Sequence, residues 1–150
     1  MKYVYTDGNN KDFAVLCSML DDYLNDIVGG EKQREKYAQY NTLENIHDVI
    51  VVYDGGEAVA CGSFKHYEKG VAEVKRVFVR GDYRGRGISK HVMVTLEEKA
   101  KEKGYKSLIL ETGNILAAAF AMYKNLGYDI IENYGQYAGM SESVCMRKEL

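Results

Sequence analysis

The sequence predicts a mixed α/β domain in which helices cover a central β-sheet. Two observations point to this fold class. Alternating or β-branched runs mark seven short strands, and helical spacing of apolar residues marks four further segments. Strands and helices are interspersed along the chain and separated by glycine-containing turns, an order that indicates a layered domain. We expect a single domain over residues 1–150, because that length is ordinary for one domain.

The amino-terminal half is expected to supply four strands and two helices. Apolar residues recur at helical intervals after Asp12, and the pair Gly29-Gly30 ends that pattern. Asp54-Gly55-Gly56 separates two β-rich runs and predicts a tight hairpin turn. The expected strands are Lys2–Thr6, Val49–Tyr53, Ala58–Phe64 and Val71–Val79, and the expected helices are Asp12–Ile27 and Glu31–Tyr40.

The carboxyl-terminal half is expected to supply two helices and three strands after a loop at Arg80–Arg86. Gly104 and Gly127 each follow a segment of helical pattern, as is typical of a helix end. The expected helices are Gly87–Lys103 and Ile115–Leu126, and the expected strands are Lys106–Glu111, Tyr128–Glu132 and Ser143–Lys148.

The sharpest local signal is the glycine-rich segment Val79–Lys90, which joins a predicted strand to a predicted helix. The amide groups of a first helical turn have no intrahelical partners, and with the helix dipole they form an anion site. Glycines let the backbone approach a phosphate closely. Arg84 and Arg86 add charge-assisted hydrogen bonds. The segment therefore predicts a phosphate-binding turn.

Two common phosphate loops do not fit this segment. A Walker A loop requires GxxxxGK[ST], and the sixth residue counted from Gly81 is Arg86. A Rossmann turn requires GxGxxG, and after Gly85 and Gly87 the third glycine position is occupied by Lys90. Both of these nucleotide-binding classes are excluded.

Several motifs in the correct order resemble the GNAT superfamily of N-acetyltransferases. Arg84-x-x-Gly87-x-Ser89 resembles the family's [QR]-x-x-G-x-[GA] motif, with serine at the third small position. Ala72–Val79 resembles the family's fourth strand. The segment from Leu110 to Tyr128 resembles the family's second half, often written LETG…A…LYxxxGF.

The resemblance covers about residues 45–150, including a closing strand at Glu142–Leu150, whereas residues 1–44 match only in their strand–helix–helix pattern. It implies a mostly antiparallel mixed sheet of about seven strands, splayed between the fourth and fifth strands and flanked by about four helices. It also implies that acetyl-CoA is the cosubstrate.

The resemblance further implies which residues contact acetyl-CoA. The backbone of Val77, Phe78 and Val79 would pair with the pantetheine in the manner of an added strand. Asn114 and the helix at Ile115–Lys124 would flank the pantetheine and the thiol. The contacts to the pyrophosphate are implied for Arg84, Gly85, Arg86, Gly87, Ile88, Ser89 and Lys90.

Acetyl transfer to an amine needs a base, an oxyanion donor and an acid. An alkylamine has a pKa of about 10.4 and arrives charged, so a base must take its proton. Glu73 lies eleven residues before Arg84, the offset at which many family members carry their base, and Glu111 is the alternative. The resemblance implies the amide of Val77 as the oxyanion donor. It implies Tyr123, beside the cofactor, as the acid that protonates the thiolate.

The expected acceptor is a primary amine of a small molecule or a peptide. In this family the first two helices usually shape the acceptor site, and residues 1–56 hold ten acidic and five basic residues. A cationic acceptor and a merely solvated acidic face explain that balance equally well. The acids concerned are Asp21, Asp22, Asp26, Glu31 and Glu35. A late loop with Tyr134, Tyr137 and Met140 is a further candidate for acceptor contact.

The alternative function is a non-catalytic sensor or scaffold domain that binds acyl-CoA without turnover. The presence of both Glu73 and Tyr123 argues against it.

Composition and charge limit the other kinds of partner that we expect. The net charge is −2, which disfavours nucleic acid although residues 75–106 carry ten basic and four acidic residues. No apolar run approaches the roughly 20 residues that a membrane span needs. Cys17, Cys61 and Cys145 are far apart, so we expect no disulfide, no zinc site and a cytoplasmic protein. The histidines show no metal-binding spacing. A homodimer, common in the family, is a further expectation.

Overall fold

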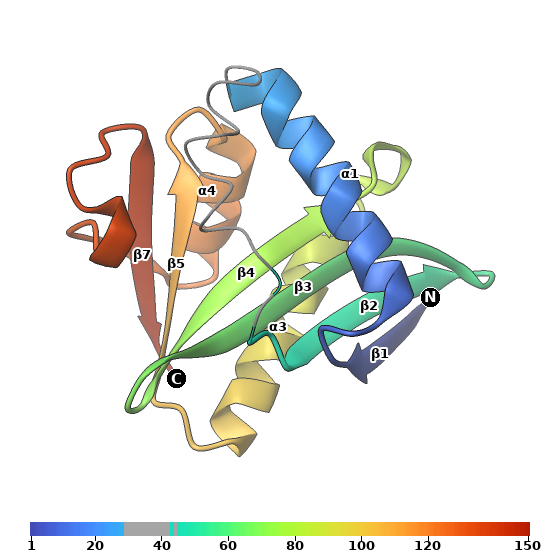
Figure 1. Ribbon diagram of the computed structural model, residues 1–150, viewed down its shortest axis with the longest axis horizontal. Coiled ribbons are helices and arrows are strands. Elements are labelled where there is room, and N and C mark those ends of the chain that lie inside the picture. The colour runs from blue at the N-terminus through green and yellow to red at the C-terminus, as the bar shows by residue number, and fades with distance from the viewer. Residues whose placement is uncertain (29–42, 44) are drawn as a thin grey trace.

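The computed structural model describes residues 1–28, 43 and 45–150, which include one seven-stranded sheet and its flanking helices (Figure 1). The strands are β1 (Lys2–Thr6), β2 (Asp48–Asp54), β3 (Glu57–Glu68), β4 (Val71–Val79), β5 (Ser107–Gly113), β6 (Asp129–Ile131) and β7 (Ser143–Glu149). The helices are α1 (Lys11–Val28), α3 (Ile88–Glu102) and α4 (Ala117–Asn125), with 3₁₀ turns η1 (Gly81–Tyr83) and η2 (Gly135–Tyr137). The predicted mixed α/β class is confirmed.

The sheet has the strand order β1-β2-β3-β4-β5-β7-β6. All neighbouring strands are antiparallel except β4 and β5, which are parallel. That parallel pairing is short and covers only residues 71–73 of β4 against 107–109 of β5. Figure 1 shows the two strands side by side at this end and diverging toward their arrowheads. The predicted splay between the fourth and fifth strands is therefore confirmed.

Two predictions about the elements need correction or lie outside the described residues. The described part of the chain contains three α-helices, whereas about four were expected. The additional expected helix, Glu31–Tyr40, falls in residues that the structure does not describe. Strand β3 runs to Glu68 and does not end at Phe64 as predicted. The hairpin pairing with β4 explains the extension, because residues 65–68 still face partners there.

Helices cover the sheet on both faces. In Figure 1, α1 crosses in front of β2 and β3, while α3 and α4 lie behind the sheet. The α1 face contains a small core with Phe13 and Leu16 of the helix packed on Val49 and Val51 of β2. The larger core lies on the α3 face. The alternation of side chains along each strand therefore decides which face a residue serves.

Helix α3 approaches β3 unusually closely at one glycine. A Cβ atom built on Gly62 would lie 2.5 Å from Cγ1 of Val92 and 3.1 Å from Cδ1 of Leu96, both on α3. Real carbon atoms do not approach to 2.5 Å, so only glycine fits at this crossing. The close contact packs α3 tightly on β3, and Ile88 at the start of α3 shares the larger core with Val79 at the end of β4.

A β-bulge interrupts β4 opposite this glycine. Cys61 pairs with Phe78 and Ser63 pairs with Lys75, so two residue steps on β3 face three on β4. Arg76 has the left-handed φ of +60°, which is rare for a residue with a side chain. The bulged carbonyls are satisfied by β3, since Ser63 Oγ donates to Lys75 O at 2.5 Å and Cys61 Sγ to Arg76 O at 3.3 Å. The bulge turns both Lys75 and Arg76 toward the α1 face.

Candidate functional site

The glycine-rich turn leaves the start of α3 open. Gly85 and Gly87 have φ values of +78° and +75°, which favour glycine, and a Cβ on either would meet nothing within 4 Å. Gly87 is the N-cap of α3, and no side chain caps the helix there. The first-turn amides of Ile88, Ser89 and Lys90 are therefore accessible to an anion, and no acidic residue stands in that turn.

The loop before this turn is anchored to the β2–β3 hairpin. Tyr83 Oη donates to Oδ2 of Asp54 at 2.8 Å, and Arg80 forms ion pairs with Glu57 and Asp82. These contacts fix the segment that leads into the helix. Because this loop is fixed in place, the glycines that follow it are also positioned, which favours a preformed anion site.

Arg84 and Arg86, which the sequence assigns to phosphate contacts, are exposed but already have protein partners. Arg84 Nε donates to Val79 O at 3.0 Å, and its guanidinium lies 4.2 Å from the ring centroid of Tyr23 on α1. Arg86 Nη2 donates to Asp82 O at 3.3 Å. Both guanidinium groups still carry their charge beside the turn, where they raise its attraction for a phosphate.

The end of β4 lies next to this turn. Phe78 is buried against the α1 core, and Val77 packs on the larger core of the α3 face. Within the described residues, β4 has no register partner on β5 beyond Glu73. The side of β4 that faces the splay, which includes Val77, Phe78 and Val79, therefore offers backbone groups to an extended ligand.

Glu73 is only 2% exposed and has a defined partner. Its neighbours Ala72 and Val74 belong to the α3-side core, so Glu73 projects from the α1 face. Tyr134, from the segment between β6 and β7, donates its hydroxyl to Oε2 of Glu73 at 2.7 Å. A buried carboxylate that accepts a hydrogen bond from a phenol is a candidate for proton chemistry.

Lys75 is buried on the same face, two residues further along β4. Its Nζ lies 3.3 Å from the hydroxyl of Tyr137, and burial lowers the pKa of the lysine while the Glu73 carboxylate opposes that shift. Burial likewise raises the pKa of Glu111 on β5, with a hydrogen bond from Ser143 and the charge of Lys75 acting against it. Glu73 and Glu111 thus share one charged neighbour.

Tyr123 lies on α4, on the opposite face of the sheet from Glu73. It is 7% exposed, and its ring meets that of Tyr128 edge-on with centroids 5.9 Å apart. Burial, reinforced by the charge of Glu111, raises the pKa of Tyr123, so its phenol stays protonated at neutral pH. The two predicted catalytic side chains therefore lie on opposite faces of the sheet.

Asn114 is exposed in the turn that joins β5 to α4. Its backbone amide donates to Glu142 O at 2.8 Å, which ties this turn to the entry of β7. The residue therefore lies at the end of β5, and its contact with the pantetheine stays a prediction.

The acidic residues expected to attract a cationic acceptor divide into three groups. Asp21 forms an ion pair with Arg76, whose Nη1 lies 2.9 Å from Oδ1 and whose side chain is 3% exposed. Asp22 and Asp26 lie on exposed positions of α1. Glu31 and Glu35 fall outside the described residues. The carboxylate of Asp21 thus serves the bulge of β4, which the acidic composition did not reveal.

Sequence reasoning missed the contacts of Lys75 and Tyr134. One signal was present, since the strand V-A-E-V-K-R-V-F-V places three charged residues inside an apolar run. Such residues are buried only with partners. The identity of those partners was not readable, because Tyr134 lies 61 positions away in the chain.

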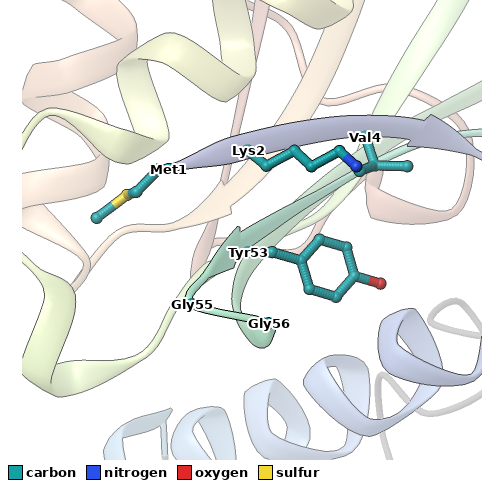
Figure 2. Close-up of a pocket in the computed structure, with 6 residues that line it drawn as sticks. All are labelled: Met1, Lys2, Val4, Tyr53, Gly55 and Gly56. Atoms are coloured by element: carbon teal, nitrogen blue, oxygen red, sulfur yellow. The ribbon is translucent and has the colours of Figure 1, made fainter.

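A separate open pocket with a volume of about 520 Å³ lies at the far edge of the sheet. Figure 2 shows that Lys2 and Tyr53 border it, beside the turn of the β2–β3 hairpin. The described lining residues are Met1, Lys2, Val4, Tyr53, Gly55 and Gly56. None of these carries a carboxylate or an imidazole, and none belongs to the glycine-rich turn. We therefore place the candidate site at β4 and α3.

Two searches of the described residues bear on other kinds of site. No group of three or more His, Cys, Asp or Glu side chains in that part of the chain is arranged to hold a metal ion. Among the described helices, none combines the length and apolar character of a membrane span. All three cysteines are buried and unpaired.

The chain is similar to several known acetyltransferases. The model of the acetyltransferase (GNAT) family matches residues 15–128. An IAA acetyltransferase of Azospirillum brasilense is 32% identical over 136 residues, covering 90% of this chain and 88% of that protein. A solved acyl-CoA N-acyltransferase structure from Klebsiella pneumoniae is 29% identical with a TM-score of 0.78, covering 99% of this chain and 97% of that one.

A more distant structure shows the same fold with a ligand. The PaiA N-acetyltransferase of Thermoplasma acidophilum, solved in complex with coenzyme A, has a TM-score of 0.74 at 15% identity, with full coverage of both chains. Together with the family match, these similarities identify the class of protein. The chain belongs to the GNAT acetyltransferase family.

Proposed function

We propose that this protein is an acetyl-CoA-dependent N-acetyltransferase that acetylates a primary amine of a small molecule or a peptide within a ternary complex. One observation carries the proposal. The open, uncapped start of α3 adjoins the unpaired side of β4, and the same strand carries the buried carboxylate of Glu73. An anion site, a strand-like binding edge and a base thus occur along one continuous segment.

The residues of the turn fit the diphosphate of coenzyme A. Open space above Gly85 and Gly87 allows close backbone approach, and the amides of residues 88–90 supply donors. Arg84, Arg86 and Lys90 add three positive charges on exposed positions. Val77–Val79 would hold the pantetheine through backbone hydrogen bonds, and Asn114 would border it from β5.

The chain's own groups would then handle protons and charge. Acetyl-CoA would supply the activated acetyl group as a thioester. Glu73 would take the proton of the amine, directly or through a water molecule, and the Val77 amide would stabilise negative charge on the carbonyl oxygen. Tyr123 would protonate the leaving thiolate. The raised pKa of this buried phenol supports its role as a proton donor, because it keeps the proton in place at neutral pH.

The proposal also includes the domain assignment and the cellular location. We take residues 1–150 as one acetyltransferase domain, since the sheet draws strands from Lys2 to Glu149. We take the location to be cytoplasmic, since unpaired cysteines suit a reducing compartment.

Activity on a panel of amines tests the function. The purified chain would receive acetyl-CoA with cationic, neutral or anionic amines and an unblocked peptide, and thiol release would be followed together with the mass of the amine. We expect thiol release that depends on the amine and matches the acetylated product. Tight acetyl-CoA binding without turnover on any amine would favour the sensor function. Absence of acetyl-CoA binding would overturn the proposal.

The identity of the base has its own test. Glu73→Gln should lower kcat by about 100-fold or more, the usual contribution of a positioned base, with unchanged affinity for acetyl-CoA. Glu111→Gln is the matched variant, because Glu111 lies near the same Lys75. A large loss in Glu111→Gln with normal turnover in Glu73→Gln would move the base to Glu111.

A further inference from the structure

The segment between β6 and β7 reaches the candidate base, although nothing in the chemistry above uses it. We propose that Tyr134 is a positioning residue for Glu73, which holds one carboxylate oxygen so that the other can accept the proton of the amine. The segment around η2 then belongs to the catalytic site. This inference rests on the proposed role of Glu73.

The geometry of the contact is specific. The phenol donates to Oε2 of Glu73 at 2.7 Å, and Glu73 is almost completely buried. A buried carboxylate needs partners for its oxygens, and a hydrogen bond to the charged form stabilises that form. Because the phenol binds Oε2, we assign the other carboxylate oxygen, Oε1, to the acceptor.

Tyr134 is held by its own segment and does not depend on Glu73 for its place. The ring meets those of Tyr67 and Tyr137 edge-on, with centroids 5.2 Å and 5.7 Å apart. Nδ2 of Asn133 lies within 3.2 Å of three carbonyl oxygens, which closes the segment upon itself. Those oxygens belong to Tyr137, Met140 and Ser143. The hydroxyl is thus delivered by a prearranged loop, as expected of a positioning residue.

Charged and titratable groups from four strands surround Glu73. Lys65 faces it across β3 by register, and Lys75 follows it on β4. Further titratable groups on this face include Tyr67 of β3, Arg76 of β4, Glu111 of β5, Cys145 of β7 and Tyr137 of η2. The phenol of Tyr134 donates directly to the carboxylate. Burial and the Glu73 charge raise the pKa of Tyr134, so the phenol remains a donor while the enzyme works.

Only one proton moves in this step. It passes from the ammonium group of the acceptor to Oε1 of Glu73, and the electron pair of the broken N–H bond stays on nitrogen as its lone pair. Tyr134 keeps its own proton throughout. Without the Tyr134 hydroxyl, the carboxylate loses a donor that stabilises its charge. Its other oxygen is then no longer oriented toward the amine.

Tyr134→Phe tests the inference, since it removes the hydroxyl and keeps the ring in its place. We expect kcat to fall about 10-fold with the acetyl-CoA KM unchanged, because the variant loses one hydrogen bond to a charged group. Tyr67→Phe is the matched control, because Tyr67 packs on the same ring. It should leave kcat unchanged. A Tyr134→Phe variant with the wild-type kcat would overturn the inference.

Two further measurements separate this inference from the proposed function. In the Glu73→Gln background, Tyr134→Phe should cause no additional loss, because a positioning residue acts only through its partner. A further loss of kcat of about 10-fold in that background would overturn the positioning role alone. Normal activity of Glu73→Gln would overturn the assignment of Glu73 as the base. If Tyr134→Phe does not fold, 3-fluorotyrosine at position 134 preserves the packing and keeps the hydroxyl as a donor. It should retain the wild-type kcat, and a loss of about 10-fold would count against the inference.

Discussion

The glycine-rich turn and the Glu73–Tyr134 pair are built in opposite ways. The turn is made of consecutive residues whose backbone angles and open space come from Gly85 and Gly87. The pair joins β4 to a segment 61 positions later and depends on the order of four strands in the sheet. Residues that bind through the backbone can be recognised locally, whereas residues that act through buried side chains require the whole sheet.

This difference predicts different consequences of mutation. Changes in the turn should remove cofactor binding while leaving the rest of the fold in place. Changes on the α1 face of β4 should alter turnover or stability while cofactor binding persists. The bulge at Arg76 joins the two regions, because it lies between Glu73 and the end of β4.

The largest effect is expected from Gly87→Val. A side chain would enter the open space that we propose for the diphosphate, and a β-branched residue is strained at φ +75°. Loss of charge-assisted bonds worth about 3 kcal/mol would weaken coenzyme A binding by about 100-fold or more in calorimetry. Gly104→Val is the matched control, with φ +91° and open space at the other end of α3. Equal loss of affinity in both variants would show that strain alone explains the effect.

The next effect concerns the junction between the two regions. Asp21→Asn would leave the 3%-exposed guanidinium of Arg76 without its carboxylate partner. The carboxylate itself is 33% exposed, so we expect a loss of about 2 kcal/mol in unfolding free energy, below the usual cost of breaking a fully buried pair. Urea denaturation measures it. Asp26→Asn, five residues along the helix on an exposed position, is the comparison variant. A similar loss there would remove the special role of the Arg76 ion pair.

Tyr123→Phe should have a smaller effect that is confined to turnover. A thiol has a pKa of about 8.5, so its thiolate leaves readily and the acid contributes only about 10-fold to kcat. Affinity for coenzyme A should hardly change. Steady-state kinetics with a separate binding titration would show this split. Unchanged kcat would remove Tyr123 from the mechanism. Tyr128→Phe is the comparison variant, because it removes a hydroxyl from the neighbouring ring.

The smallest effect is a dependence of stability on pH. The pKa of Glu111 in the folded protein is raised by burial, so the folded state holds this proton more tightly than the unfolded chain does. The stability that this proton confers is present at low pH and is lost as pH rises through the raised pKa. Glu111→Gln should remove that decline, so the variant gains stability relative to the wild type toward neutral pH. Urea titrations at several pH values would measure it, and parallel curves would contradict it.

The agreement between prediction and structure follows the same division. The hairpin at Asp54-Gly55-Gly56 is confirmed with positive φ at both glycines, and helix α3 begins after Gly87 and ends before Gly104 as expected. The splay between β4 and β5 is also confirmed. In contrast, the length of β3 was underestimated. Its last residues are polar and alternate weakly, and only their pairing with β4 extends the strand.

The candidate site shows why part of it escaped prediction. Glu73, Tyr123 and the glycine turn were found from motifs in which spacing along the chain is informative. The Arg76–Asp21 pair and the Tyr134–Glu73 hydrogen bond connect positions 55 and 61 residues apart. Such contacts leave no periodic trace, because each partner looks like an ordinary polar residue in its own segment.

By itself, the sequence determined the order of strands and helices, the hairpin and the open turn before α3. These features follow from backbone freedom at glycine and from apolar spacing, which act over a few residues. Only the tertiary structure decided that β4 bulges toward α1 and that Tyr134 rests on Glu73. The reason is that strand register and burial are properties of the assembled sheet, where a shift of one residue would turn Glu73 to the other face.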